Sequence, residues 1–308
     1  MGSVAAAFSF DLAARHRLRL RLAWTGMLLF LFSTLYYGLP YYLLDSEQRG
    51  GSPLNAAMRP SGSIGIRLGF LGLGIFLLLF LYPIRKRWPW LGRKGKTKHW
   101  LDFHVLLGVS APIVITLHSS FKLRGLAGLA YWIMMAVALS GVVGRYLFSQ
   151  IPRSMTTAEL SFQDMEEQLT RFSAQMRSQS LLSEAEIAPL LRLPSREEVD
   201  ALSLMGALWR ILQLDLTRPF QVAVLRRRFL TAGGQLLTLG GLLPSPNAEL
   251  EGAIAAVRAQ SWLSTKMLFL SRLQELFRLW HVVHRPFSYS FVVLVIVHIT
   301  VAMLFGYY

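Results

Sequence analysis

Four histidines lie inside two apolar stretches of this sequence, where a polar ring is costly unless it has a partner. His104 and His118 are 118 − 104 = 14 residues apart, and His284 and His298 are 298 − 284 = 14 residues apart. Fourteen residues are close to four turns of an α-helix, so each pair projects from one helix face, with the rings about 21 Å apart along the axis. His281 lies 298 − 281 = 17 residues from His298, roughly 100° off that face, so His284 is the better partner.

This spacing predicts two sites for haem iron. Two such helices side by side bring His104 opposite His284 and His118 opposite His298. Imidazole is a good iron ligand, and two imidazoles fill both axial positions of a haem, which suits electron transfer. We therefore expect two haem b groups, one in each half of the bilayer. Zinc is disfavoured, because pairs about 21 Å apart cannot give one ion four ligands. Hydrogen bonding between helices and a proton relay are the alternatives.

Other residues near the four histidines are weaker candidates. Gly108 lies one turn beyond His104 and leaves room for a porphyrin edge, and Gly141 and Gly144 could do the same, although glycine in spans also permits close helix packing. Basic residues stand where haem propionates would emerge, and lipid phosphate is an equally good partner for each: Lys98, Arg145 and Arg285 at the inner end, Lys122 and Arg124 at the outer end. Pro112 is expected to kink its helix slightly. For His16 and His99, which lie in basic flanks, we expect contact with solvent or lipid headgroups.

The composition places the chain in the membrane class. Its 308 residues are 53% hydrophobic, and the mean hydropathy is +0.42. The sequence contains no cysteine, which excludes disulfides, Cys-ligated zinc, iron–sulfur clusters and covalent c-type haem within this chain. The net charge of +15 is concentrated in clusters at 15–21 and 85–98, beside apolar stretches. Such clusters are typical of membrane topology signals and lipid contacts, so we expect no nucleic-acid partner.

Five stretches have the roughly 20 apolar residues that a membrane span needs. They cover 22–44, 64–84, 101–121, 125–144 and 287–308. We expect an all-α integral membrane protein with a five-span transmembrane helix bundle, whose first span is a retained anchor and not a signal peptide. The positive-inside rule places the N-terminus and the 85–98 loop in the cytoplasm and the C-terminus outside, and we expect the bacterial inner (cytoplasmic) membrane.

The chain divides into four expected parts. These are a basic cytoplasmic N-terminus (1–21), spans one to four (22–148), a helical cytoplasmic insert (149–283) and span five (284–308). Within the insert, helical spacing of apolar residues and a serine cap predict helices over 161–176 and 195–212, and 248–280 is expected to be one long helix leading to span five. Residues 231–247 are expected to form a loop, and no nucleotide-binding motif is present there.

The stretch "LWHVVHRPFSYSFVVLVIVHITVAML" resembles the ligand-bearing helix of ferric-reductase-like transmembrane domains. This family includes the haem subunit of the methionine sulfoxide reductase system and the membrane part of NADPH oxidases. The matching residues are Trp280, His284 with Arg285, Tyr289 and His298, and "KHWLDFHVLLGVSAPIVITLHSSF" is similar to the other ligand helix. The resemblance implies two stacked b-type haems that pass single electrons across the membrane. It covers spans three to five. The long insert before span five departs from the family, as does the lack of a sixth span and of a flavin or nicotinamide domain.

We therefore expect an electron-transfer subunit with no complete active site of its own. Its partners are expected to be other subunits of a membrane redox complex, namely an iron–sulfur, flavin or multihaem protein, docked on the insert or the outer loops. One alternative is a quinol-oxidising or quinone-reducing cytochrome b subunit with a quinone site beside one haem. A second alternative is a non-redox membrane scaffold or transporter whose histidines are structural.

Overall fold

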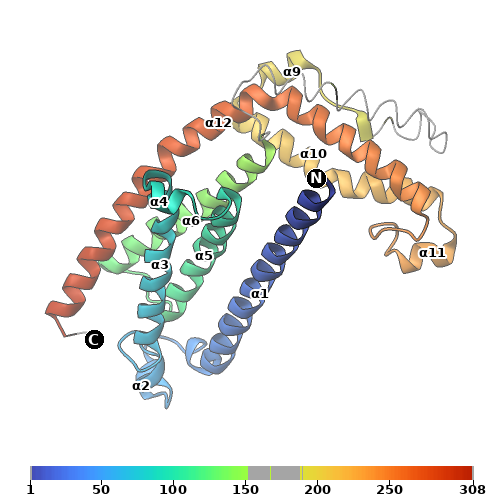
Figure 1. The fold of residues 1–308 in the computed structure, drawn as a ribbon. Coiled ribbons are helices and arrows are strands. Elements are labelled where there is room, and N and C mark those ends of the chain that lie inside the picture. The colour runs from blue at the N-terminus through green and yellow to red at the C-terminus, as the bar shows by residue number, and fades with distance from the viewer. Residues whose placement is uncertain (1, 152–166, 168–187, 189, 307–308) are drawn as a thin grey trace. The chain divides into compact units, whose positions relative to one another are not determined.

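The computed structural model describes residues 2–151, 167, 188 and 190–306, and within these residues the fold is helical without strands (Figure 1). Five of its helices are long and apolar enough to cross a membrane: α1 (Gly2–Tyr42), α3 (Gly65–Arg87), α5 (Thr97–His118), α6 (Gly125–Gln150) and α12 (Ala248–Leu304). The prediction of an all-α protein with five candidate spans is therefore confirmed.

The chain forms two compact units. The membrane unit comprises Met1–Arg145 together with His281–Tyr308, and the insert unit comprises Tyr146–Trp280. The insert unit begins and ends three residues before the insert expected from the sequence, 149–283. Two helices run from one unit into the other, α6 near its C-terminal end and α12 in its second half.

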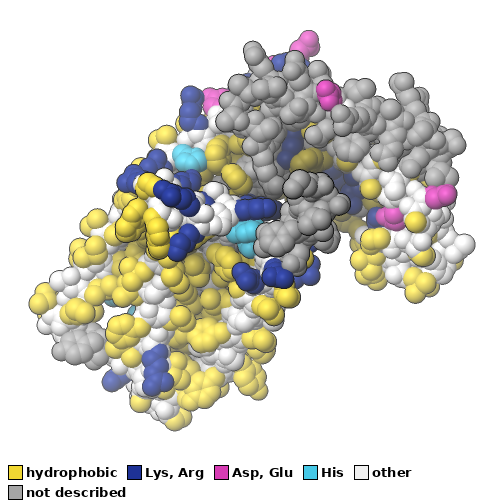
Figure 2. All heavy atoms as spheres, in the orientation of Figure 1, with side chains coloured by type: hydrophobic (Ala, Val, Ile, Leu, Met, Phe, Trp, Pro, Cys, Tyr) yellow, Lys and Arg dark blue, Asp and Glu magenta, His cyan; other side chains and the backbone are white. Residues whose placement is uncertain are grey.

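The helices α3 and α5 pack side by side in the membrane unit (Figure 1). Glycine permits this close approach, because a Cβ added to the buried Gly72 would lie 2.3 Å from Ile115 Cδ1. Of the five candidate spans, α5 has the largest share of its membrane-spanning window buried inside the structure. The core around it contains Tyr41, Met58 and Val114, which are fully buried. On the face seen in Figure 2, hydrophobic side chains cover much of this unit's surface, as expected for helices solvated by lipid.

The end of α5 is held by the segment that follows α1. This segment contains η1 (Gln48–Gly51) and α2 (Asn55–Met58), and its Arg49 donates to the carbonyls of Tyr42 at 2.9 Å and Ser120. Ser120 has a positive φ of 50° and donates its hydroxyl to Met58 O at 2.6 Å. Since a non-glycine residue at positive φ is strained, these hydrogen bonds stabilise the turn immediately after α5.

The insert unit is built from α9 (Arg196–Ala201), α10 (Leu204–Arg228), α11 (Ala232–Leu237) and the first half of α12. The prediction of one helix over 195–212 is wrong, because a break occurs where Ser203 caps a new helix by accepting from the Gly206 amide at 3.1 Å. The loop expected over 231–247 contains α11, which Thr231 caps. The predicted long helix over 248–280 is confirmed within α12. The helix expected over 161–176 falls almost entirely outside the described residues.

Ion pairs join the helices of the insert unit. Arg226 of α10 forms a bidentate pair with Glu251 of α12, with both N–O distances at 2.7 Å. Asp215 accepts hydrogen bonds from Tyr146 at 2.7 Å and from Gln150 at 2.6 Å, both in the last turns of α6. Burial lowers the pKa of Arg218, which pairs with Asp215 at 3.0 Å. A bidentate pair such as Arg226–Glu251 fixes the orientation of the two helices as well as holding them together.

Candidate haem-binding site

The four candidate histidines lie on two helices of the membrane unit. His104 and His118 are on α5, and His284 and His298 are on α12. The imidazoles of His104 and His284 are near enough to interact electrostatically, and so are those of His118 and His298. All four rings are partly buried. Each histidine of α5 therefore lies within electrostatic range of one histidine of α12.

The ring of His104 is oriented by α3. Its Nδ1 lies 3.1 Å from the carbonyl oxygen of Leu79, in the middle of that helix. Such a carbonyl normally accepts from the amide four residues later, but that residue is Pro83, which has no N–H. The proline therefore leaves the Leu79 carbonyl available to His104. Because a carbonyl only accepts, Nδ1 carries the hydrogen, and Nε2 retains its lone pair in the neutral ring.

The ring of His118 rests against the beginning of α3. Its Nδ1 donates to Gly65 O at 2.8 Å. The ring also lies over Gly69: a Cβ at that position would be 2.8 Å from Cε1, 3.0 Å from Nδ1 and 3.3 Å from Nε2 of His118. Only a residue without a side chain leaves space for the imidazole here. Gly65 and Gly69 therefore set the position of the ring and again direct Nε2 away from the hydrogen bond.

The ring of His284 is oriented by α6. Its Nδ1 lies 2.7 Å from the hydroxyl oxygen of Ser140, which also lies 2.8 Å from Val137 O. A hydroxyl can donate or accept, so this contact orients the His284 ring without fixing which ring nitrogen carries the hydrogen. Gly141 follows Ser140, and a Cβ there would lie 3.7 Å from Cε1 of His284, in ordinary contact.

His298 is placed differently from the other three histidines. Its ring is partly buried, and no hydrogen bond of this ring is found among the described residues. Midway between the two histidines of α12 is Phe291, seven residues from each. Its ring packs edge to face on Phe76 of α3, with centroids 4.7 Å apart. An aromatic contact between α12 and α3 is therefore made from a position midway along α12 between His284 and His298.

The histidine arrangement suits axial ligation of haem. A metal-binding histidine usually donates its other ring N–H to a carbonyl or other acceptor, which fixes the tautomer and orientation of the ring. His104 and His118 have such an acceptor in a carbonyl of α3, and His284 has the Ser140 hydroxyl as its partner. No three His, Asp or Glu side chains gather at one point within the described residues.

The remaining candidates lie in varied surroundings. A Cβ added to Gly108 would touch only Leu79 Cδ2, at 3.8 Å, so the position is uncrowded. Arg145 lies 2.8 Å from Asp102, which the sequence did not suggest. Gly144 and Pro112 are buried, and His281 interacts electrostatically with its neighbour three residues on. The other expected propionate partners are exposed: Lys98, Lys122, Arg124 and Arg285.

One expectation is wrong in this region. His16 and His99 do not simply face solvent or lipid, because their rings stack with centroids 3.6 Å apart, and His16 Nε2 lies 3.0 Å from the buried carboxylate of Asp102. The sequence contained no signal for this contact, since it joins α1 to α5. The residues that orient the candidate ligands were missed for the same reason. The role of Pro83 could have been predicted from the sequence, because a proline inside a helix leaves the carbonyl four residues before it, that of Leu79, without its usual amide donor.

The class that the fold defines is a helical protein with five candidate membrane spans and two histidine pairs in its membrane unit. Comparison with models of protein families, with curated proteins and with solved structures finds no match for this chain. The resemblance to ferric-reductase-like domains therefore rests only on the residues of the two histidine helices that were named in the sequence analysis.

Proposed function

We propose that this chain is a cytochrome b subunit that carries electrons across the bilayer by way of two bis-histidine b-type haems. His104 and His284 would hold the inner haem, and His118 and His298 the outer one. The proposal follows the ferric-reductase-like family in fold and cofactor. The chain would act within a larger oxidoreductase, because it offers haem ligands but no other recognisable redox centre.

The observation that supports the proposal is the way neighbouring helices hold three of the histidine rings. In His104 and His118, Nδ1 donates to a carbonyl of α3 at 3.1 and 2.8 Å, and Nδ1 of His284 lies 2.7 Å from the Ser140 hydroxyl of α6. In His104 and His118 this leaves Nε2 as the nitrogen that can coordinate iron. A structural histidine that only bridges helices would need one bond of this kind, but it would not need a second histidine within electrostatic range.

The protein groups have defined roles in this proposal. When bound, the haem iron supplies one-electron chemistry, and two axial imidazoles leave no open position for oxygen activation. The carbonyls of Leu79 and Gly65 hold the rings of His104 and His118 in orientation and raise their basicity, and Ser140 Oγ orients the ring of His284. The apolar core around α5 keeps water from the site, which sets the local dielectric. The His298 ring has no hydrogen bond among the described residues, so fewer contacts restrain it than restrain the other three rings.

The partners and the orientation are also proposed. The basic N-terminus and the 85–98 loop would lie in the cytoplasm together with the insert unit, and the C-terminus outside a bacterial inner membrane. An iron–sulfur, flavin or multihaem protein would dock on the insert unit or the outer loops to deliver or remove electrons. This orientation is tested by single-cysteine labelling, since the chain has no native cysteine. Ser52→Cys should react with an impermeant maleimide in intact spheroplasts, and Arg93→Cys only after lysis.

Haem content tests the central proposal. The purified chain should contain two b-type haems with a reducible Soret band and α-band. His298→Ala should remove one haem and leave the other, whereas the control His281→Ala, on the same helix but outside the pairs, should retain both. A protein without reducible haem, or a His298→Ala variant with two, would contradict the assignment.

A further inference from the structure

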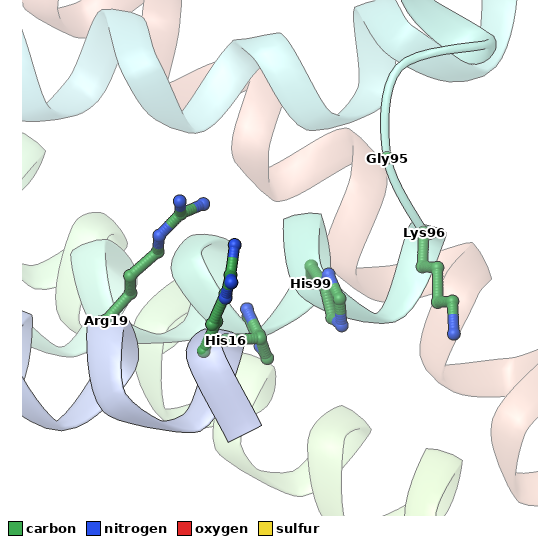
Figure 3. A pocket seen from close by; sticks show the side chains of 6 residues that line it. His16, Arg19, Gly95, Lys96 and His99 are labelled. Carbon is green, nitrogen blue, oxygen red and sulfur yellow. The ribbon is translucent and has the colours of Figure 1, made fainter. Parts of the chain in front are cut away.

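A second set of charged and titratable side chains lies at the end of the membrane unit that carries the basic loops. A pocket of about 230 Å³ opens between α1 and the start of α5 (Figure 3). Its volume is more than ten times the roughly 10–15 Å³ that a single water needs. The residues that line it are Arg15, His16, Arg19, Gly95, Lys96 and His99. None of them belongs to the histidine pairs described above.

The α1 side of the pocket is held by a buried carboxylate. Asp102 is 7% exposed and accepts from His16 at 3.0 Å through one oxygen and from Arg145 at 2.8 Å through the other. The imidazole of His16 in turn stacks on that of His99, with an interplanar angle of 13°. These contacts fix two walls of the pocket. Each oxygen of Asp102 therefore already has one positively charged or imidazole partner outside Arg19 and Lys96.

The loop side of the pocket is held by a buried arginine. Arg85, at the end of α3, donates to Gly92 O at 2.9 Å, Gly95 O at 2.8 Å and Thr97 Oγ1 at 3.0 Å. Gly95 has a φ of +70°, a conformation that glycine adopts without strain. Trp100 adds a hydrogen bond from Nε1 to Lys94 O at 2.9 Å. These hydrogen bonds hold the loop before α5 in one conformation without a bound ligand, and they fix the backbone position of Lys96.

The charge of this pocket is positive. Arg19 and Lys96 approach it from different elements, and neither has an ion pair within the described part of the chain. No described lining side chain is a carboxylate. Cations gathered around a concave surface raise the local concentration of anions. Arginine and lysine are also the side chains that bind phosphate oxygens, by paired hydrogen bonds and as a point charge respectively.

We propose that this pocket binds a phosphate group, carried either by an anionic phospholipid or by a small soluble phosphate ester. Arg19 and Lys96 lie towards the two ends of the pocket and attract the phosphate by their charge, and the stacked pair of His16 and His99 lies between them (Figure 3). The site is independent of the haem proposal, because it lies on α1 and the loop before α5.

The test uses the full chain, purified in neutral detergent and stripped of lipid. One arm titrates it with phosphatidylglycerol and counts bound lipid by native mass spectrometry, and the other titrates it with glycerol 3-phosphate in a calorimeter. Arg19→Gln with Lys96→Gln should weaken binding about 25-fold, because each basic side chain near an anionic surface contributes about a factor of five. The matched control, Arg21→Gln with Arg93→Gln, removes the same charge from the same two elements outside the pocket.

The outcomes separate the two sources of phosphate. Binding of phosphatidylglycerol alone supports a lipid headgroup, and binding of glycerol 3-phosphate as well supports a site for the phosphate group itself, provided that only the pocket variant loses affinity. Absence of binding in both arms, or equal losses in pocket and control variants, overturns the proposal. Thermal unfolding of both variants establishes that each remains folded.

Discussion

A single methyl group at Gly69 should discriminate between a structural and a ligating role for His118. The Gly69→Ala change places a Cβ 2.8 Å from Cε1 of the imidazole, whereas carbon atoms in good contact are about 3.5 Å apart. The ring must therefore move by about 0.7 Å, from the difference of these two distances. A functional site needs its groups held within about 0.5 Å, so ligation by His118 should suffer.

The same helix supplies the control. Gly74 is also in α3, and a Cβ there meets no atom within 4 Å. Gly74→Ala should stabilise the helix by up to about 1 kcal/mol, through the helix propensity that alanine adds. Gly69→Ala gains the same propensity, but the overlap with the ring costs about 1–3 kcal/mol. We therefore expect Gly69→Ala to be less stable than Gly74→Ala by that amount.

Haem quantification and reduced-minus-oxidised spectra provide the assay, with thermal unfolding measured in parallel. Gly69→Ala should lose the outer haem or shift its spectrum while keeping the inner haem, and Gly74→Ala should keep both. If Gly69→Ala retained two unaltered haems and gained as much stability as Gly74→Ala, the placement of the His118 ring against α3 would be refuted.

Three further changes probe the surroundings of the two sites. Ser140→Ala removes the hydrogen-bond partner of His284 and should weaken retention of the inner haem by about 10- to 100-fold, measured by haem transfer to apomyoglobin, while Ser140→Thr, which keeps a hydroxyl, should retain it. Pro83→Ala restores a backbone N–H that competes with His104, so thermal stability should rise while the inner haem potential shifts in a redox titration; an unshifted potential would count against the proline's role. Arg49→Gln removes charged hydrogen bonds at the turn after α5 and should cost about 2 kcal/mol in unfolding experiments, with the outer haem lost first on heating.

The helical class and the five candidate spans were predictable from the sequence, because lipid allows a spanning chain few alternatives. Buried backbone groups must be hydrogen-bonded within the segment, so length and hydropathy are sufficient to predict a helix. The insert was harder to predict. Ser203 starts a new helix inside a continuous pattern of apolar residues. Its side chain caps the new helix through a local hydrogen bond, and the spacing of apolar residues does not reveal such a hydrogen bond.

For the candidate site as well, one part was predictable from the sequence and another part was not. The 14-residue intervals on α5 and α12 determined which histidines share a face, because the helical repeat converts sequence spacing directly into direction. The sequence alone could not determine what each ring would touch. Gly69, Leu79 and Ser140 lie on α3 and α6, far from the histidines in sequence. Only the packing of helices against one another decides which carbonyl, hydroxyl or missing side chain meets an imidazole, and therefore which ring nitrogen is left to bind.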